Sequence, residues 1–189
     1  MKTKSEETYV GLLRGVNVGG NNKLPMKALV ALCEAHGCKS VQTYIQSGNV
    51  IFRAGAKIAG GFAEGLKTKI KEEFGFQTTV IVRSADNLKV AAKSNPFFTP
   101  KVETRFLHVM FLADEPNLTD VVKLNPVCEG EEAFSLRGKE IFFYLPNGVG
   151  RSKMANYGFD KILRTVGSTR NWQTVQKLIE LCDKTRLPS

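Results

Sequence analysis

The segment from Arg14 to Lys23, RGVNVGGNNK, places two cations at the ends of a run rich in glycine and asparagine. Glycines in such a loop let backbone N–H groups turn toward a ligand, and the N-terminus of a following helix adds partial positive charge. Arg14 and Lys23 can pair with phosphate or carboxylate oxygens, while Gly19 and Gly20 can offer backbone donors. The segment therefore predicts an anion site. The alternative is a surface loop in which Gly and Asn form left-handed turns.

This loop differs from the two best-known phosphate-binding motifs. Gly15 and Gly20 have the separation of a Walker A loop, but Asn21-Asn22 stand where that motif requires Lys followed by Ser or Thr. The GxGxxG pattern of a dinucleotide-binding fold does not occur. A connector of ten residues is nevertheless long, which keeps a functional role open.

A second polar segment, Gln46-Ser47-Gly48-Asn49, lies between two strand-like runs. A two-residue hairpin turn needs only Ser47-Gly48, so the turn alone explains much of the segment. The functional alternative is that Gln46, Ser47 and Asn49 orient a ligand together with Asn17.

Two segments near the C-terminus resemble the first loop. Gly148–Lys153, GVGRSK, combines glycines with two cations, and Thr169-Arg170-Asn171-Trp172 is expected to open the last helix with Thr169 or Asn171 as its cap. Trp172 is more often a core residue than a stacking platform. Together these segments predict one shared basic site between the two halves of the chain. The candidate ligand-binding residues are Arg14, Asn17, Gly19, Gly20, Lys23, Gln46, Ser47, Asn49, Arg151, Lys153, Arg170, Asn171 and Trp172.

Catalytic and metal-binding patterns are weak. His36 is at a predicted helix end and His108 is in an apolar strand, and no Cys–His or Ser–His–Asp set can be assembled from spacing. Cys33-x-x-His36-x-Cys38 resembles a fragment of a metal site, but no second pair of ligands follows. We therefore expect no metal and no cofactor, and enzymatic activity stays open.

Apolar residues recur along the chain with the periods of strands and helices. In the first half, the predicted order is strand, helix, strand, strand, helix, strand. The corresponding ranges are Thr8–Leu13, Met26–Gly37, Val41–Gln46, Asn49–Arg53, Ile58–Phe74 and Thr78–Val82. Ser84 is expected to cap a short helix that ends at Lys93.

The second half repeats this order without repeating the residues. Its predicted elements are Phe106–Leu112, a helix from Pro116 to Leu124, Phe134–Arg137, Glu140–Leu145, a helix capped by Ser152, a short strand near Ser168 and a last helix carrying Trp172. The order predicts an α+β fold of two tandem ferredoxin-like (split βαβ) units with antiparallel sheets. The expected boundaries are 1–94 for the first unit, 95–104 for a connector and 105–189 for the second unit with its C-terminal helix.

The net charge of +9 is uneven. Residues 1–100 contain 14 Lys and Arg against 7 Asp and Glu, residues 101–150 contain 5 against 8, and residues 151–189 contain 8 against 3. This balance favours anionic partners. The N-terminus has no apolar run of signal-peptide length, no segment is long enough for a membrane helix, and four cysteines lack a CxxC pair, so we expect a cytoplasmic protein without a membrane partner.

Nucleic acid is the competing partner. Tyr9-Val10-Gly11-x-Leu13 resembles the shorter signature of an RNA-recognition motif, whose fold has the same element order. The longer signature should carry several aromatic residues, whereas Ser47–Phe52 offers one. RNA binding is therefore weakly indicated.

Several motifs resemble one protein family. YVGLLRGVNVGGNNKLPM, TYIQSGNVIF, NPF at Asn95–Phe97 and TRNWQTV at Thr169–Val175 are similar to the bacterial domain of unknown function family numbered 1697. The resemblance extends from Tyr9 to about Cys182 and implies two ferredoxin-like units in tandem. It implies no activity. The leading hypothesis is thus a protein that binds a small anionic ligand, with a nucleic-acid-binding module and a protein-interaction scaffold as alternatives. The sequence does not indicate an oligomeric state.

Overall fold

The structure, a computed structural model, describes residues 6–126 and 128–186 of the 189-residue chain. The chain divides into two compact units, Met1–Lys89 with Lys177–Ser189 and Val90–Gln176. These boundaries fall inside two helices and not in the predicted connector 95–104. The second half of the last helix belongs with the first unit, where Gln42 Nε2 donates to Thr185 Oγ1 over 2.6 Å.

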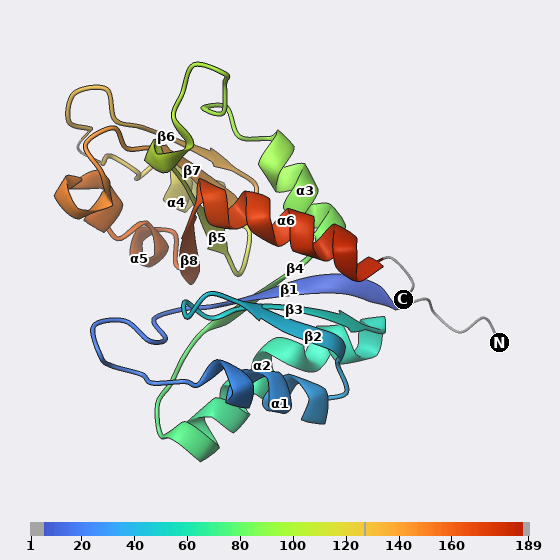
Figure 1. Ribbon diagram of the computed structural model, residues 1–189. Helices are drawn as coiled ribbons and strands as arrows, with labels where there is room; N and C mark the ends of the chain where they lie inside the picture. The colour runs from blue at the N-terminus through green and yellow to red at the C-terminus, as the bar shows by residue number, and fades with distance from the viewer. Residues whose placement is uncertain (1–5, 127, 187–189) are drawn as a thin grey trace. The chain divides into compact units, whose positions relative to one another are not determined.

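The first unit has the order that the apolar pattern predicts. Its four strands form an antiparallel sheet in the order β2-β3-β1-β4, and α1 and α2 cover one face of that sheet (Figure 1). The elements are β1 (Glu7–Leu13), α1 (Met26–Ala35), β2 (Lys39–Tyr44), β3 (Asn49–Ala54), α2 (Ala56–Phe74), β4 (Val80–Ser84) and α3 (Ala85–Lys93). The predicted cap is present, because Ser84 Oγ accepts a hydrogen bond from Asn87 N over 3.1 Å.

The second unit repeats the arrangement. Its sheet has the order β6-β7-β5-β8, again antiparallel, which confirms the predicted α+β class and is consistent with two tandem ferredoxin-like units. The elements are a 3₁₀ turn η1 (Thr104–Phe106), β5 (Leu107–Leu112), α4 (Leu118–Val121), β6 (Ala133–Arg137), β7 (Glu140–Tyr144), 3₁₀ turns η2 (Val149–Arg151) and η3 (Met154–Asn156), α5 (Phe159–Ile162), β8 (Gly167–Asn171) and α6 (Trp172–Arg186).

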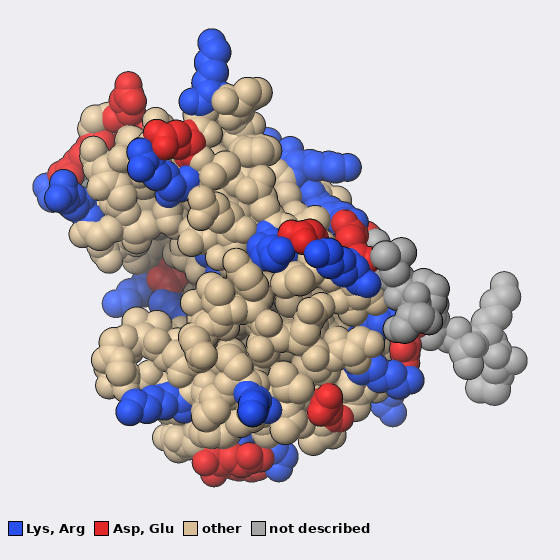
Figure 2. Space-filling model, in the orientation of Figure 1, with Lys and Arg blue, Asp and Glu red and all other residues tan. Residues whose placement is uncertain are grey.

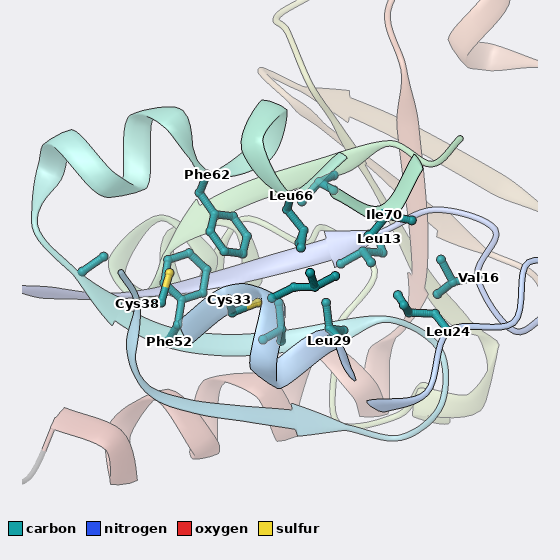
Figure 3. Packing of buried hydrophobic residues seen from close by; sticks show 14 residues of the cluster. Leu13, Val16, Leu24, Leu29, Cys33, Cys38, Phe52, Phe62, Leu66 and Ile70 are labelled. Atoms are coloured by element: carbon teal, nitrogen blue, oxygen red, sulfur yellow. The ribbon is translucent and has the colours of Figure 1, made fainter. Parts of the chain in front are cut away.

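Successive side chains of β1 point to opposite faces of the sheet, and those on one face contribute to the first core. Leu13 points toward α1 and α2, where Phe52 of β3 stacks on Phe62 of α2 with ring centroids 4.1 Å apart. Figure 3 shows these side chains together with Val16 and Leu24, the two buried residues of the loop that follows β1. The loop is therefore anchored in the core at two points.

Several predicted elements differ in detail from the structure. The strand predicted for Val41–Gln46 ends at Tyr44, so the β2–β3 turn has four residues, 45–48, and not two. The helix predicted after Ser152 is divided between η3 and the four-residue α5. Residues Thr169–Asn171 belong to β8, so the last helix begins at Trp172. None of the helices in the described part of the chain is long and apolar enough to cross a bilayer.

Candidate functional site

Asn17 joins the two polar segments of the first unit. Its Nδ2 donates to Leu24 O and to Gln46 O, both over 2.9 Å, and its Oδ1 accepts a hydrogen bond from Leu24 N over 2.8 Å. Both donors of the carboxamide are therefore used. Asn17 holds the loop, the β2–β3 turn and the start of α1 at one end of the sheet, and its carboxamide donors are not available to a ligand.

Gly19 and Gly20 form the exposed tip of a small hairpin within the loop. Both have positive φ angles, +56° and +80°, and Asn21 N donates to Val18 O over 3.0 Å across the tip. Asn22 Nδ2 donates to Gly15 O over 2.9 Å at the base. The loop is thus an ordered hairpin and not a cradle of the Walker type.

The β2–β3 turn is built around Gly48. Leu13 N donates to Gly48 O over 2.8 Å, and a Cβ atom on Gly48 would lie 2.5 Å from Val16 Cγ2 and 2.7 Å from Leu13 Cβ. Asn49 is fully buried, and its Nδ2 donates to Tyr44 O over 3.1 Å. Gly48 and Asn49 therefore shape the turn, whereas Gln46 and Ser47 are exposed.

Ile45 is the unusual residue of this turn. It has a φ angle of +50°, a conformation that a β-branched side chain adopts only under strain, and its side chain is 49% exposed. Because about half of the Ile45 side chain is exposed, its hydrophobic burial offsets only part of the free-energy cost of this backbone conformation. The hydrogen bonds of Asn17 to Leu24 and Gln46 are called the Asn17 clamp below. Val18, which is 62% exposed, adds a second apolar side chain next to this clamp.

The exposed groups at this end of the sheet are basic. Arg14 and Lys23 are both exposed, and neither segment 14–25 nor segment 45–48 contains Asp or Glu. The first turn of α1 lacks acidic residues, and its N-cap, Pro25, makes no side-chain cap hydrogen bond. Partial positive charge from the helix N-terminus is therefore not neutralised by an acidic side chain in that turn.

The second unit provides an internal comparison. At the end of β5, Leu112 N donates to Lys139 O over 2.8 Å, which corresponds to the hydrogen bond from Leu13 N to Gly48 O at the end of β1. The second unit then reaches α4 through residues 113–117, five residues, where the first unit uses residues 14–25, twelve residues. The fold can therefore close with a short connection, so the hairpin loop exceeds what the topology requires.

The basic candidates of the second unit are in different environments. Lys153 pairs with Glu129 over 2.7 Å, a hydrogen bond that raises the pKa of Lys153, while Arg151 is exposed in η2. Arg170 is only 8% exposed, and burial lowers its pKa to about 10. Its Nη1 donates to Ser168 Oγ over 2.9 Å and to Thr169 O over 2.8 Å.

Asn171 and Trp172 have structural roles. Asn171 Oδ1 accepts a hydrogen bond from Thr174 N over 2.8 Å, which confirms it as the cap of α6. Trp172 is buried and packs against Phe98 with ring centroids 5.1 Å apart, as expected for a core residue. The shared site between the two halves stays a prediction.

The fragment with metal-site spacing is split by the fold. Cys33 and Cys38 are buried in the first core as free thiols, and burial raises the pKa of Cys38 to about 11. His36 instead meets the edge of Phe62, with ring centroids 5.7 Å apart. Within residues 6–126 and 128–186 there is no cluster of three or more side chains able to hold a metal ion.

A family model described as protein of unknown function (DUF1697) matches residues 7–142. The chain belongs to the DUF1697 family. The matched range includes the hairpin loop and the β2–β3 turn, and it ends before Arg151. A comparison with curated proteins gives no match.

One solved structure resembles this DUF1697 protein over almost its whole length. It is the conserved bacterial protein SP0830 from Streptococcus pneumoniae, with 21% sequence identity and a TM-score of 0.75. The similarity covers 94% of this chain and 99% of that chain. At this identity the comparison supports the fold alone.

Proposed function

We propose that the protein binds a small anionic ligand, phosphorylated or nucleotide-like, at the end of the first sheet. The observation that carries this proposal is the Asn17 clamp, which joins two segments without carboxylates beside the exposed side chains of Arg14 and Lys23. Gln46 and Ser47 supply exposed polar groups on the second segment.

The arrangement suits an anion for two physical reasons. The hydrogen bonds of Asn17 and Asn22 order the loop in advance, so a ligand would not have to order it. The N-terminus of α1 adds partial positive charge beside the clamp, because Leu24 N is bonded to Asn17 Oδ1 just before the helix begins. If the protein is an enzyme, these groups would act by positioning and electrostatics.

Phe52, the one aromatic residue of the longer RNA-binding signature, does not support the nucleic-acid alternative. Phe52 is fully buried against Phe62, so it offers no surface to a base. On the face of the first unit seen in Figure 2, Lys and Arg side chains stand among Asp and Glu side chains instead of forming one continuous basic surface. A small ligand fits these observations better than a polyanion.

We also propose that the protein acts in the cytoplasm. The four cysteines Cys33, Cys38, Cys128 and Cys182 are all free, which agrees with a reducing compartment.

A thermal-shift screen tests the ligand class. The purified protein is heated with inorganic phosphate, pyrophosphate, nucleotides, sugar phosphates and short oligonucleotides at low and physiological salt. A ligand that binds only the folded state raises the melting temperature. We expect a salt-resistant rise with one small anion, and its loss in the double variant Arg14→Ala, Lys23→Ala.

A matched variant controls for net charge. Lys57→Ala with Lys71→Ala removes two exposed cations from α2, so its charge change equals that of the test variant. It should keep the rise in melting temperature. A rise only with oligonucleotides that fades with salt would replace the proposal with nucleic-acid binding. No rise with any anion would reject it and favour the scaffold.

A further inference from the structure

A pocket of about 290 Å³ opens between the C-terminal end of α1 and the second half of α2. Its apolar lining comes from Leu32, Ala35 and Leu66, and its polar lining comes from His36, Lys69 and Glu73. His36 is the C-cap of α1, so the pocket is at the opposite end of that helix from the candidate anion site.

Gly65 allows His36 to occupy its place. A Cβ atom on Gly65 would lie 2.4 Å from His36 Cε1 and 2.7 Å from Nδ1, so any larger residue would displace the ring. A glycine inside a helix costs about 1 kcal/mol relative to alanine. The imidazole therefore lies directly on the backbone of α2, at the wall of the pocket.

Two polar side chains of this pocket, His36 and Glu73, can accept a hydrogen bond from a ligand. In the described part of the chain, neither ring nitrogen of His36 and neither oxygen of Glu73 has a hydrogen bond or an ion pair. Lys69 is different, because its Nζ pairs with Glu72 over 2.8 Å. Lys69 is thus bonded to a residue outside the lining, and this hydrogen bond and the nearby negative charges of Glu72 and Glu73 raise its pKa. The Glu73 carboxylate and the His36 ring nitrogens keep hydrogen-bonding capacity for a ligand.

The helix dipoles add to this preference. Leu32, Ala35 and His36 belong to the last turn of α1 or follow it directly, and that turn contains no basic residue. Glu73 is next to the last residue of α2. The C-terminal end of a helix carries partial negative charge, which favours a cation there.

We propose that this pocket binds a small cationic ligand, a protonated amine carried on a short aliphatic or aromatic body. The ammonium group donates to the Glu73 carboxylate and to a His36 ring nitrogen, and the body lies on Leu32, Ala35 and Leu66. The volume is at the lower limit of ligand pockets, which sets the ligand to a small molecule. A metal ion does not fit, because the lining offers two suitable side chains only.

The test follows the Cε1–H signals of the two histidines by NMR while phenethylamine is added. His108 belongs to the second unit and serves as the internal reference. Hydrocinnamate, a carboxylate of matched size, is the control ligand. We expect a saturable shift of the His36 signal with the amine, no such shift with the carboxylate, and an unchanged His108 signal.

Two variants of α2 separate the contact from the overall charge. Glu73→Gln removes the proposed partner and should weaken amine binding at least about tenfold. Glu64→Gln makes the same charge change at an exposed residue that pairs with Lys67, and it should leave binding unchanged. A His36 signal that does not respond, that responds equally to hydrocinnamate, or that is insensitive to Glu73→Gln would overturn the proposal. Neither result bears on the Arg14 and Lys23 site.

Discussion

The Asn17 carboxamide donates both of its hydrogens to backbone carbonyls and accepts a third hydrogen bond, so its role is to build the site. Gly48 and Asn49 act in the same way in the facing turn. The sequence could not separate these residues from Arg14 and Lys23, because turns and ligand sites use the same polar residue types. Burial and hydrogen bonding make the separation.

Ile45 and Gly48 allow a direct test of how the turn is held. Ile45→Gly should stabilise the protein by about 1 kcal/mol, because it removes a β-branched residue from a positive φ angle. Gly48→Ala should destabilise it by about 2–4 kcal/mol, because the new Cβ would overlap Val16 and Leu13. Urea denaturation of both variants measures these changes. Destabilisation by Ile45→Gly would show that the isoleucine packs usefully.

His108 predicts a pH dependence of stability. Burial lowers its pKa below the ordinary value of 6.5, so the unfolded state takes up a proton at a higher pH than the folded state. The stabilisation is fully present above pH 6.5 and is lost as the pH falls toward the folded pKa. We therefore expect the free energy of unfolding to fall less between about pH 7.5 and about pH 5.5 in His108→Gln than in the wild type.

The control for this experiment is His36→Gln, which leaves His108 in place. It should keep the part of the pH dependence that His108→Gln removes. Denaturant titrations at both pH values provide the free energies. An identical fall in the wild type and in His108→Gln would contradict the account of a histidine kept neutral by burial.

Helices and strands were predictable where local pattern and burial agree. α1 and α2 have apolar residues at helical spacing, and these residues are buried. The helix predicted from Pro116 shortens to α4. Val121 and Leu124 pack on the second core, but Leu118 and the C-cap residue Val122 are each 81% exposed, so little apolar burial supports a longer helix. β8 consists of Gly167 and four polar residues, and pairing with β5 provides what local propensity does not.

The packing of α1 on α2 predicts an energetic coupling between Gly65 and His36. In the wild type, Gly65→Ala should destabilise the protein, because the new methyl group displaces the His36 ring. In a His36→Ala background, the same change should stabilise it by about 1 kcal/mol through helix propensity. Gly60→Ala, where space is open, should stabilise both backgrounds. A Gly65→Ala effect that is equal in both backgrounds would contradict the contact.

At the scale of the whole molecule, the repeated order of elements predicted two ferredoxin-like units, and both sheets have that topology. The boundaries were harder to predict, because α3 and α6 each contribute residues to both units. An amphipathic pattern shows that a helix has a buried face, but it does not show which unit that face contacts. The sequence also did not reveal that Arg170 of β8 is buried, because arginine is mostly exposed in proteins.

The most direct test of the central claim is a backbone amide NMR titration with inorganic pyrophosphate. Binding at the hairpin loop and the β2–β3 turn predicts saturable shifts confined to residues 14–28 and 45–48, and their loss in Arg14→Ala, Lys23→Ala. The equivalent connection of the second unit, residues 113–117, should not respond. Absent shifts, or shifts of equal size in residues 113–117, would contradict an anion site at this end of the first sheet.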